Sequence, residues 1–368
     1  MAITANHASG TGTTEGQYLD VSHHTITGYQ GTAPVMVAAS NATTLEKVQA
    51  VASGGSVCDG TNDYVEWQAV LDTGVSPVAS SGTFDLGTTG LLFKFDGQMV
   101  RGQGRRKTIL KTTSAINMVA FSPAAGRGNW EDVTVRGCVL ADMTLLGHSA
   151  IGYSNGAGAN QSCNKGVYGR YAVDFHMENI EICQFVQWGV HFLDLNGHTL
   201  SLNNVWIHDC GNSVYAGTNF YSGGLKIGSE WDELKYPFNT VKTHSLVIES
   251  CYDGVWVVQT ANSVIDGVIE GNYRYGVVCD YEGAPYALAG LFLQVYCEAN
   301  GGTADIYIHS GNDYYIRIEN CLLGSSGVTN AVIVDGSYQS NVRLAFGNNI
   351  DANSKTNSLG TSVAWTAG

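Results

Sequence analysis

Residues 246–279 read LVIESCYDGVWVVQTANSVIDGVIEGNYRYGVVC. This stretch contains one pattern twice. Ile248-Glu-Ser-Cys251 is followed by Gly254-Val-Trp-Val257, and Ile269-Glu-Gly-Asn272 is followed by Gly276-Val-Val-Cys279. Short alternating segments bounded by Gly, Asn or Asp are typical of β-strands. The two copies begin at Ile248 and Ile269, and together with the further copies along the chain they predict a repeating unit of roughly 24 residues, built from two or three short strands.

The first half of the pattern recurs along the chain. Further copies are Val135-Arg-Gly-Cys138, Ile180-Glu-Ile-Cys183, Ile207-His-Asp-Cys210, Gln294-Val-Tyr-Cys297 and Ile318-Glu-Asn-Cys321. Most steps are short, and the two long ones, from Val135 to Ile180 and from Ile207 to Ile248, predict one turn plus an insertion of roughly 20 residues. Since helical periodicity is absent, we expect an all-β parallel β-helix in which equivalent positions stack into ladders. An inward column of cysteines is one such predicted ladder.

Composition excludes several classes of protein. The 368 residues include 46 Gly but only 5 Pro, which favours tight turns between paired strands over disordered linkers. A net charge of −14 argues against nucleic acid as a partner, because phosphate binding needs a basic surface. No apolar run reaches the ~18 residues of a membrane span. Residues 1–9 lack the basic and apolar regions of a signal peptide.

Cysteine and histidine usage argues against disulfides and metal. The nine cysteines are odd in number and form no C-x-x-C motif, so buried reduced thiols are expected. The ten histidines do not join them at zinc-ligand spacing. We therefore expect no structural metal and no cofactor.

The N-terminal part predicts helices that cover the first coil. Asp63 with Glu66 has the spacing of a capping box, and Tyr64, Trp67, Gln68, Val70 and Leu71 form one mostly apolar face. Residues 43–52 predict a second short helix. A helix placed before a β-solenoid protects an open end that would otherwise recruit another strand.

The same region resembles a known superfamily. Residues 58–71, CDGTNDYVEWQAVL, resemble the DGTxDD-x-x-IQxAL opening of the pectate-lyase-like superfamily of right-handed parallel β-helices. Ser81-Gly-Thr-Phe84, Met99-Val-Arg-Gly-Gln-Gly104 and Thr108-Ile-Leu110 are similar to the segments that follow in that family. The resemblance implies a right-handed parallel β-helix with an N-terminal capping helix. It does not imply one function, because the superfamily includes lyases, hydrolases, epimerases, phage tailspikes and non-catalytic virion proteins.

The expected organisation follows from these patterns. We expect an extended arm over residues 1–42, a capping helix and first coils over 43–128, a β-helix over 129–347 and a tail over 348–368. Insertions are expected near residues 147–171 and 211–243. An arm, a β-helix and a tail together resemble phage tailspike proteins, which are homotrimers assembled in the host cytoplasm.

Outward positions of the repeat offer a place for chemistry. The residue after the first inward apolar residue should point outward, and this predicted column reads Arg136, Glu181, His208, Glu249, Glu270, Val295 and Glu319. Glu249 and Glu270 lie one coil apart, so they should stack at about one strand spacing. Two such carboxylates suit acid–base hydrolysis of a glycosidic bond, and the neighbouring Trp206 and Trp256 suit stacking on sugars. The alternative is a solvated acidic face.

Other residues leave further alternatives open. Arg274, flanked by two tyrosines, would suit a lyase, or it is a surface arginine beside packing tyrosines. The second insertion carries Trp231 and Tyr236 among carboxylates, which would suit glycan binding or a trimer interface.

The first functional interpretation is a virion surface protein of tailspike or fibre type. It would bind host-surface polysaccharide or other virion proteins as a homo-oligomer, with trimer the expected state. The alternative is a polysaccharide hydrolase or lyase that uses Glu249 and Glu270. A purely architectural role in the virion is the third.

Overall fold

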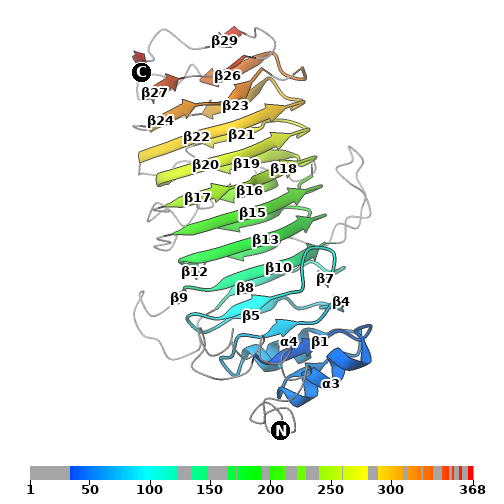
Figure 1. Ribbon diagram of the computed structural model, residues 1–368. Helices are drawn as coiled ribbons and strands as arrows, with labels where there is room; N and C mark the ends of the chain where they lie inside the picture. The colour runs from blue at the N-terminus through cyan, green and yellow to red at the C-terminus, as the bar shows by residue number, and fades with distance from the viewer. Residues whose placement is uncertain are drawn as a thin grey trace, which may run out of the picture.

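The computed structural model shows a stack of coils that climbs from two N-terminal helices to the C-terminus (Figure 1). The structure describes residues 34–122, 134–147, 165–170, 172–192, 199–212, 222–228, 240–258, 260–280, 289–309, 314–324, 326–334, 342–347, 350–351, 356–358 and 364–367. Strands of successive coils pair in parallel, as β13 with β15 and β20 with β22. The predicted parallel β-helix is confirmed.

Two sheets run along the stack, and a short two-stranded sheet joins them. The long sheet contains β1 Met36–Ala38, β2 Ser56–Val57, β3 Val78–Ala79, β4 Gly82–Asp85, β6 Met99–Arg101, β7 Thr108–Lys111, β10 Val139–Leu146, β13 Phe175–Cys183, β15 Leu200–His208, β17 Val241–His244, β18 Leu246–Glu249, β20 Ala261–Glu270, β22 Ala289–Glu298, β24 Tyr314–Glu319, β25 Leu322–Leu323, β27 Val342–Gly347, β28 Ile350–Asp351 and β30 Ala364–Ala367. The opposite sheet contains β5 Leu91–Phe93, β8 Asn117–Phe121, β11 Lys165–Gly169, β14 Trp188–Phe192, β16 Gly223–Ile227, β19 Asp253–Val257, β21 Val277–Asp280, β23 Ala304–His309, β26 Asn330–Val334 and β29 Thr356–Ser358. The short sheet pairs β9 Val135–Arg136 with β12 Ala172–Val173.

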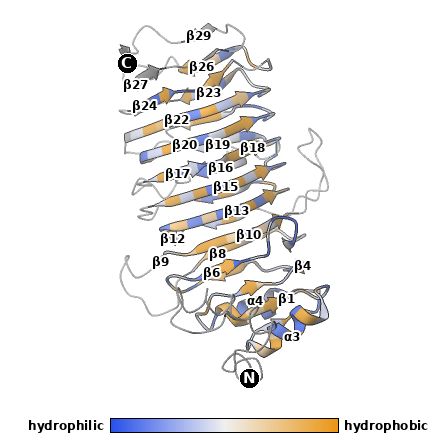
Figure 2. Cartoon of the chain, in the orientation of Figure 1, coloured by the Kyte–Doolittle hydropathy of each residue, from blue (hydrophilic) through white to orange (hydrophobic). Residues whose placement is uncertain are grey.

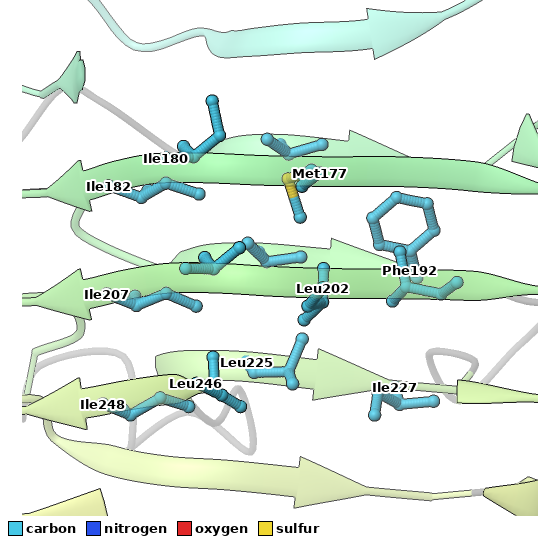
Figure 3. Packing of buried hydrophobic residues seen from close by; sticks show 14 of the residues in the cluster. Met177, Ile180, Ile182, Phe192, Leu202, Ile207, Leu225, Ile227, Leu246 and Ile248 are labelled. Carbon is cyan, nitrogen blue, oxygen red and sulfur yellow. The ribbon is translucent and has the colours of Figure 1, made fainter. Parts of the chain in front are cut away.

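The core is a set of aliphatic ladders between the two sheets. Hydrophobic and hydrophilic residues alternate along the strands (Figure 2), so one side of each strand faces inward. Ile182, Ile207, Ile248 and Ile269 occupy one inward position on four successive coils, and all four are fully buried. Three of them form a visible column (Figure 3).

A column of glycines on the opposite sheet makes room for this isoleucine ladder. Its members are Gly166, Gly189, Gly224, Gly254 and Gly276. A Cβ on Gly224 would lie 2.5 Å from Ile248 Cγ2 and 2.8 Å from the carbonyl oxygen of Gly254. The recurring glycine in the sequence pattern therefore marks close packing between the two sheets.

Gly224→Ala is expected to destabilise the protein by about 1–3 kcal/mol, the usual range for overpacking a dense core. Equilibrium denaturation of the variant measures this change. The cost should be smaller in an Ile248→Ala background, because that change removes the nearest side-chain contact of the new methyl group. Equal costs in both backgrounds would show that the Gly224–Ile248 contact is not the cause.

Several coils of the long sheet bend at stacked left-handed corners, of which there are two kinds. At the first corner, Asp142, Asn179 and Asn204 have φ between 52° and 57°, a conformation that Asn and Asp tolerate better than most residues. Asn179 Nδ2 donates to Asp142 Oδ1 at 2.7 Å, and Asn204 Nδ2 donates to Asn179 Oδ1 at 3.2 Å. At the second corner the left-handed residues are Gln184, Asp209, Ser250, Gly271 and Ala299.

Two helices cover the N-terminal end of the stack. The predicted helices are observed as α3 Thr44–Ala52 and α4 Tyr64–Leu71, and Trp67 and Leu71 are buried as expected. The predicted capping box at Asp63 is wrong, since Asp63 makes no side-chain cap. Its carboxylate instead accepts N–H groups of Gly60 and Asp85 at 2.7 and 2.8 Å, which ties α4 to the first coil.

The cysteine ladder is confirmed only in part. The eight described cysteines are free and buried, while Cys163 lies outside the described residues. Cys210 and Cys251 each come directly after the left-handed residue of the second corner, and Asn272 occupies the same position on the following coil. Cys183 instead pairs with His208, and Cys297 pairs with Ile269. The sequence alignment placed all of them in one column because it used the cysteines rather than the corner residues as its register.

Parts of the predicted arm and tail belong to the coils. Within the expected arm, β1 pairs with β2 and β3. Within the expected tail, β28 pairs with β25, and β30 pairs with β27. Neither described helix is long and apolar enough to cross a membrane.

Candidate active site

The second corner places a polar column on the outward face of the long sheet. His208, Glu249, Glu270 and Glu298 each precede the left-handed corner residue on β15, β18, β20 and β22. The register pairs them in that order along the stack. Because paired strands lie ~4.8 Å apart, three carboxylates follow one another on adjacent strands. The expected stacking of Glu249 on Glu270 is confirmed.

The other members of the predicted column lie elsewhere. Glu181 pairs with Trp206 on the next coil, and Trp206 lies two residues before His208. Glu181 therefore belongs to the neighbouring outward column. Val295 faces inward and is 1% exposed. Arg136 belongs to the short sheet, and Glu319 pairs with Gly347. These differences arise because the cysteines do not occupy one position of the coil. On its own strand, Glu181 lies two residues before the position of the column, and Val295 lies three residues before it.

Glu249 and Glu270 form a close carboxyl pair. Burial raises the pKa of Glu270, and a hydrogen bond with Glu249 and the charge of Glu249 raise it further. The charge of Glu298 acts in the same direction. Glu249 also accepts a hydrogen bond from Trp206 Nε1 at 3.0 Å, which fixes one of its oxygens. The protonated form of Glu270 is thus favoured beside an oriented Glu249.

A second acidic group, Glu181, is held by basic and hydroxyl partners. Arg106 Nη2 donates to Glu181 Oε1 at 2.8 Å and Arg106 Nε donates to the same oxygen at 3.0 Å. Thr144 Oγ1 donates to Glu181 Oε2 at 2.8 Å. Burial alone would raise the pKa of Glu181, but the hydrogen bonds from Arg106 and Thr144 lower it below its ordinary value. Glu181 is therefore a permanently ionised anchor.

His208 links the two groups. Its Nδ1 lies 2.8 Å from Asp209 Oδ2 and its Nε2 lies 3.2 Å from Glu181 Oε1. Its ring lies 4.3 Å from the ring of Trp206, and the Arg106 guanidinium lies 5.1 Å from that same ring. Burial alone would lower the pKa of His208, but its hydrogen bonds to Asp209 and Cys183 raise it to about 10.

His208 is therefore expected to stay protonated at pH 8, and an NMR pH titration of the imidazole measures this. An unfolded histidine titrates near 6.5. The ion pairs of His208 thus stabilise the fold fully below about pH 6.5, and their contribution is lost as the pH rises toward 10. Glu181→Gln should lower the His208 pKa because it removes a negative neighbour. A wild-type imidazole that titrates near 6.5 would contradict the ion-pair network.

Arg274 lies in a different environment. It donates to Asp253 through Nε at 2.8 Å and Nη2 at 2.6 Å, and Asp253 is fully buried. Its guanidinium also lies 5.1 Å from the rings of Tyr252 and Tyr275 and 5.5 Å from that of Trp256. Burial opposes the charge, yet the contact with Asp253 raises the pKa of Arg274 above its ordinary value. The geometry is that of a structural ion pair.

The predicted sugar-binding residues are thus not all brought together. Trp206 lies in the carboxylate site. Trp256 is 3% exposed and packs with Trp188, Val258 and Val278, so its rings are not available as an open platform. Trp231 and Tyr236 lie outside the described residues. Their predicted roles stay predictions.

One group in the described chain has the composition of a metal site. Ligand-type atoms of Cys58, Asp63 and Glu66 lie within 4.8 Å of one another beside α4. Both Asp63 oxygens already accept backbone N–H groups. Burial, together with the charges of Asp63 and Glu66, raises the pKa of Cys58 and favours the neutral thiol. This arrangement suits a turn that anchors the helix better than a cation.

Comparison with known proteins identifies the architecture. No family model and no curated protein matches the chain. A polygalacturonase from Erwinia carotovora ssp. carotovora has a similar structure, with a TM-score of 0.53 and 11% identity over 91% of this chain and 96% of that one. The fold is a right-handed parallel β-helix. At this identity the similarity shows the fold alone.

Two more solved structures of pectate-lyase-like fold resemble the β-helix at lower scores. An alginate lyase from Paenibacillus sp. str. FPU-7 has a TM-score of 0.49 and 11% identity over 83% of this chain and 97% of that one. The A-module of a mannuronan C-5 epimerase from Azotobacter vinelandii has a TM-score of 0.46 and 15% identity over 83% of this chain and 96% of that one.

The sequence reasoning missed the partners of Glu181 and His208, and it also missed two residues at the carboxylate column itself. Glu298 is the third carboxylate of the column, and Tyr296, two residues earlier, is 38% exposed and donates its hydroxyl hydrogen to Glu298. The alternation of Leu291, Val295 and Cys297 as inward residues was the available signal. It places Glu298 after the last inward residue, as Glu270 follows Ile269.

Proposed function

We propose that this chain binds a polysaccharide across the outward face of its long sheet and hydrolyses it. The observation that carries the proposal is the succession of Glu249, Glu270 and Glu298 on adjacent strands, with the pKa of the central carboxyl raised. Two carboxyl groups of opposite protonation state are what glycoside hydrolysis requires. The polygalacturonase fold supports a polysaccharide as the substrate.

The chemistry assigns one role to each carboxyl group. Glu270 donates its proton to the glycosidic oxygen as the bond between that oxygen and the anomeric carbon breaks. Glu298 attacks the same carbon as the nucleophile, since carboxyl groups on adjacent strands have the spacing of the two-step route. Water then cleaves the bond between Glu298 and the sugar and gives its proton to Glu270, which restores both groups. Burial and Glu249, which is fixed by Trp206, raise the pKa of Glu270 and so favour its proton-donating form. This division of labour follows general acid–base catalysis.

Glu270→Gln is expected to lower kcat by about 10²–10⁴-fold, the usual contribution of a general acid. The assay measures reducing ends released from a panel of bacterial surface polysaccharides, with absorbance near 235 nm to detect the unsaturated product of a lyase. In the wild type, kcat/KM should fall as the pH rises through the pKa of Glu270. Glu249→Gln should move this fall to lower pH because it removes the charge that raises that pKa.

Asp266→Asn is the matched control. Asp266 lies on the same strand as Glu270 and its side chain is 43% exposed, next to His244. This variant should keep wild-type activity. Cleavage by Glu270→Gln at the wild-type rate would refute the proposed hydrolysis. It would also be refuted if every new reducing end came with one unsaturated product, because the wild type would then act by elimination.

A second candidate is a virion surface protein that binds host glycan as a homo-oligomer without cleaving it. The half-buried Trp206, which donates to Glu249 at 3.0 Å, favours it, because an aromatic ring beside hydrogen-bond acceptors can bind a sugar without cleaving it. Saturable binding of a surface polysaccharide with no product, unchanged by Glu270→Gln, would favour this candidate.

A further inference from the structure

Two basic groups near the stacked glutamates, Arg106 and His208, are already matched by other acids. Arg106 binds Glu181 through two nitrogens at 2.8 and 3.0 Å. His208 lies between Glu181 at 3.2 Å and Asp209 at 2.8 Å. The positive charges of Arg106 and His208 are therefore compensated by Glu181 and Asp209, and they do not offset the charges of Glu249 and Glu298.

Two further basic groups on the long sheet, Arg101 and Arg317, also have acidic partners. Arg101 Nη1 lies 3.0 Å from Oδ2 of Asp142, which belongs to the adjacent coil. Arg317 Nε contacts Glu319 on its own strand. The surface around Glu249, Glu270 and Glu298 is thus negative. A polymer with a carboxylate on every sugar would place like charges against it, and like charges that meet at a binding surface oppose association.

The same surface has the groups that bind uncharged sugars. Tyr296 is 38% exposed and stands next to Glu298 in the neighbouring outward position. An exposed aromatic ring offers an apolar face to the C–H groups of a sugar. Carboxylates are acceptors only and take hydrogen bonds from hydroxyl groups. The partly exposed Val247 and Val268 continue the apolar strip along the stack.

We infer that the glycan bound at Glu249, Glu270 and Glu298 is a neutral polysaccharide and not a polyuronate, with Tyr296 as its stacking platform. This inference rests on the proposed function. It separates the chain from uronate-acting proteins that share the fold, since specificity follows from the site rather than from the architecture.

The test uses the Glu270→Gln variant, so that binding is measured without cleavage. Isothermal titration calorimetry compares neutral bacterial surface polysaccharides with acidic ones, with polygalacturonate and alginate among the acidic set. We expect saturable binding only of neutral polymers, with a dissociation constant that changes less than twofold between 50 and 500 mM NaCl. Tyr296→Ala should weaken this binding at least tenfold. Tyr315→Ala is the matched control. Tyr315 is 47% exposed, as a stacking residue would be, but it lies near the start of β24, whereas Glu298 lies at the end of the paired strand β22.

Each other outcome contradicts a stated part. If polygalacturonate, alginate or another acidic polymer binds saturably, and this binding depends on Tyr296, the neutral-substrate inference is overturned and the proposed hydrolysis still stands. Neutral binding that Tyr296→Ala does not weaken overturns the assignment of Tyr296. No binding of either class overturns the proposed function and this inference together.

Discussion

Arg274→Met is expected to lower the free energy of unfolding by about 3–5 kcal/mol, the usual cost of removing one partner of a buried ion pair. Asp253 is fully buried and accepts two hydrogen bonds from Arg274 at 2.8 and 2.6 Å. Methionine fills much of the same space but leaves the carboxylate without its cation. Equilibrium denaturation followed by tryptophan fluorescence measures the loss.

The loss should depend on pH. Burial already raises the pKa of Asp253, and the hydrogen bonds from Arg274 oppose that rise. Without them the folded state binds a proton more tightly than the unfolded state. The stability of the variant therefore falls as the pH rises above the unfolded carboxyl pKa of about 3.9, and the deficit is larger at pH 8 than at pH 5.

A double variant provides the control. In Arg274→Met with Asp253→Asn, no charge remains to be desolvated, so most of the lost stability should return. If the double variant is as unstable as Arg274→Met alone, the aromatic packing around Arg274 carries the stability and the ion pair does not.

Trp67→Ala is expected to cost about 3–5 kcal/mol, as large-to-small changes of buried aromatics do. Trp67 belongs to α4 and is fully buried, and its ring meets that of Phe84 edge-on at a centroid distance of 5.2 Å. The helix covers the first coil, so its loss exposes an unpaired strand edge. Native-state hydrogen exchange should show early opening of β4 and β5, while β20 and β22 keep their protection.

Trp67→Phe is the matched variant. The Trp67 indole N–H is buried, and within the described chain it has no hydrogen-bond partner. Phenylalanine removes that group and keeps an aromatic ring against Phe84, so the cost should stay below about 1.5 kcal/mol. Equal exchange rates in β5 and β22 of Trp67→Ala would contradict the role of α4 as an end cover.

The repeat was predictable because its signals are local. Ile248-Glu-Ser and Ile269-Glu-Gly each combine an inward aliphatic, an outward acid and a residue that accepts the left-handed corner. The step from one segment to the other then gives the register of Glu249 on Glu270 directly. The glycine before each second strand was also visible, although only the structure shows that Gly224 faces Ile248.

The rest of the site depends on contacts between distant segments. Nothing near Glu181 in the sequence indicates Arg106, which lies 75 residues earlier. Glu298 was missed because Cys297 faces inward beside Ile269 rather than at a corner. Trp256 follows the strand alternation that predicts an outward ring, yet Trp188 and Val278 pack against it. Alternation predicts direction, and exposure depends on what lies outside the sheet.

The stacked corners also determine which insertions and deletions the fold can tolerate. Removing one residue between Ser245 and Ser250 would move every later side chain of that coil to the opposite side of its strand, so Ile248 would leave the core and Glu249 would enter it. Gly267 pairs with Leu246 on the coil before it. Removing residues 246–266, which form one whole turn, would bring Gly267 into the position of Leu246. Every later residue would then keep its inward or outward direction. Natural variation in this molecule should therefore come in whole turns, and the number of turns sets the length of the outward face that is available to the proposed glycan.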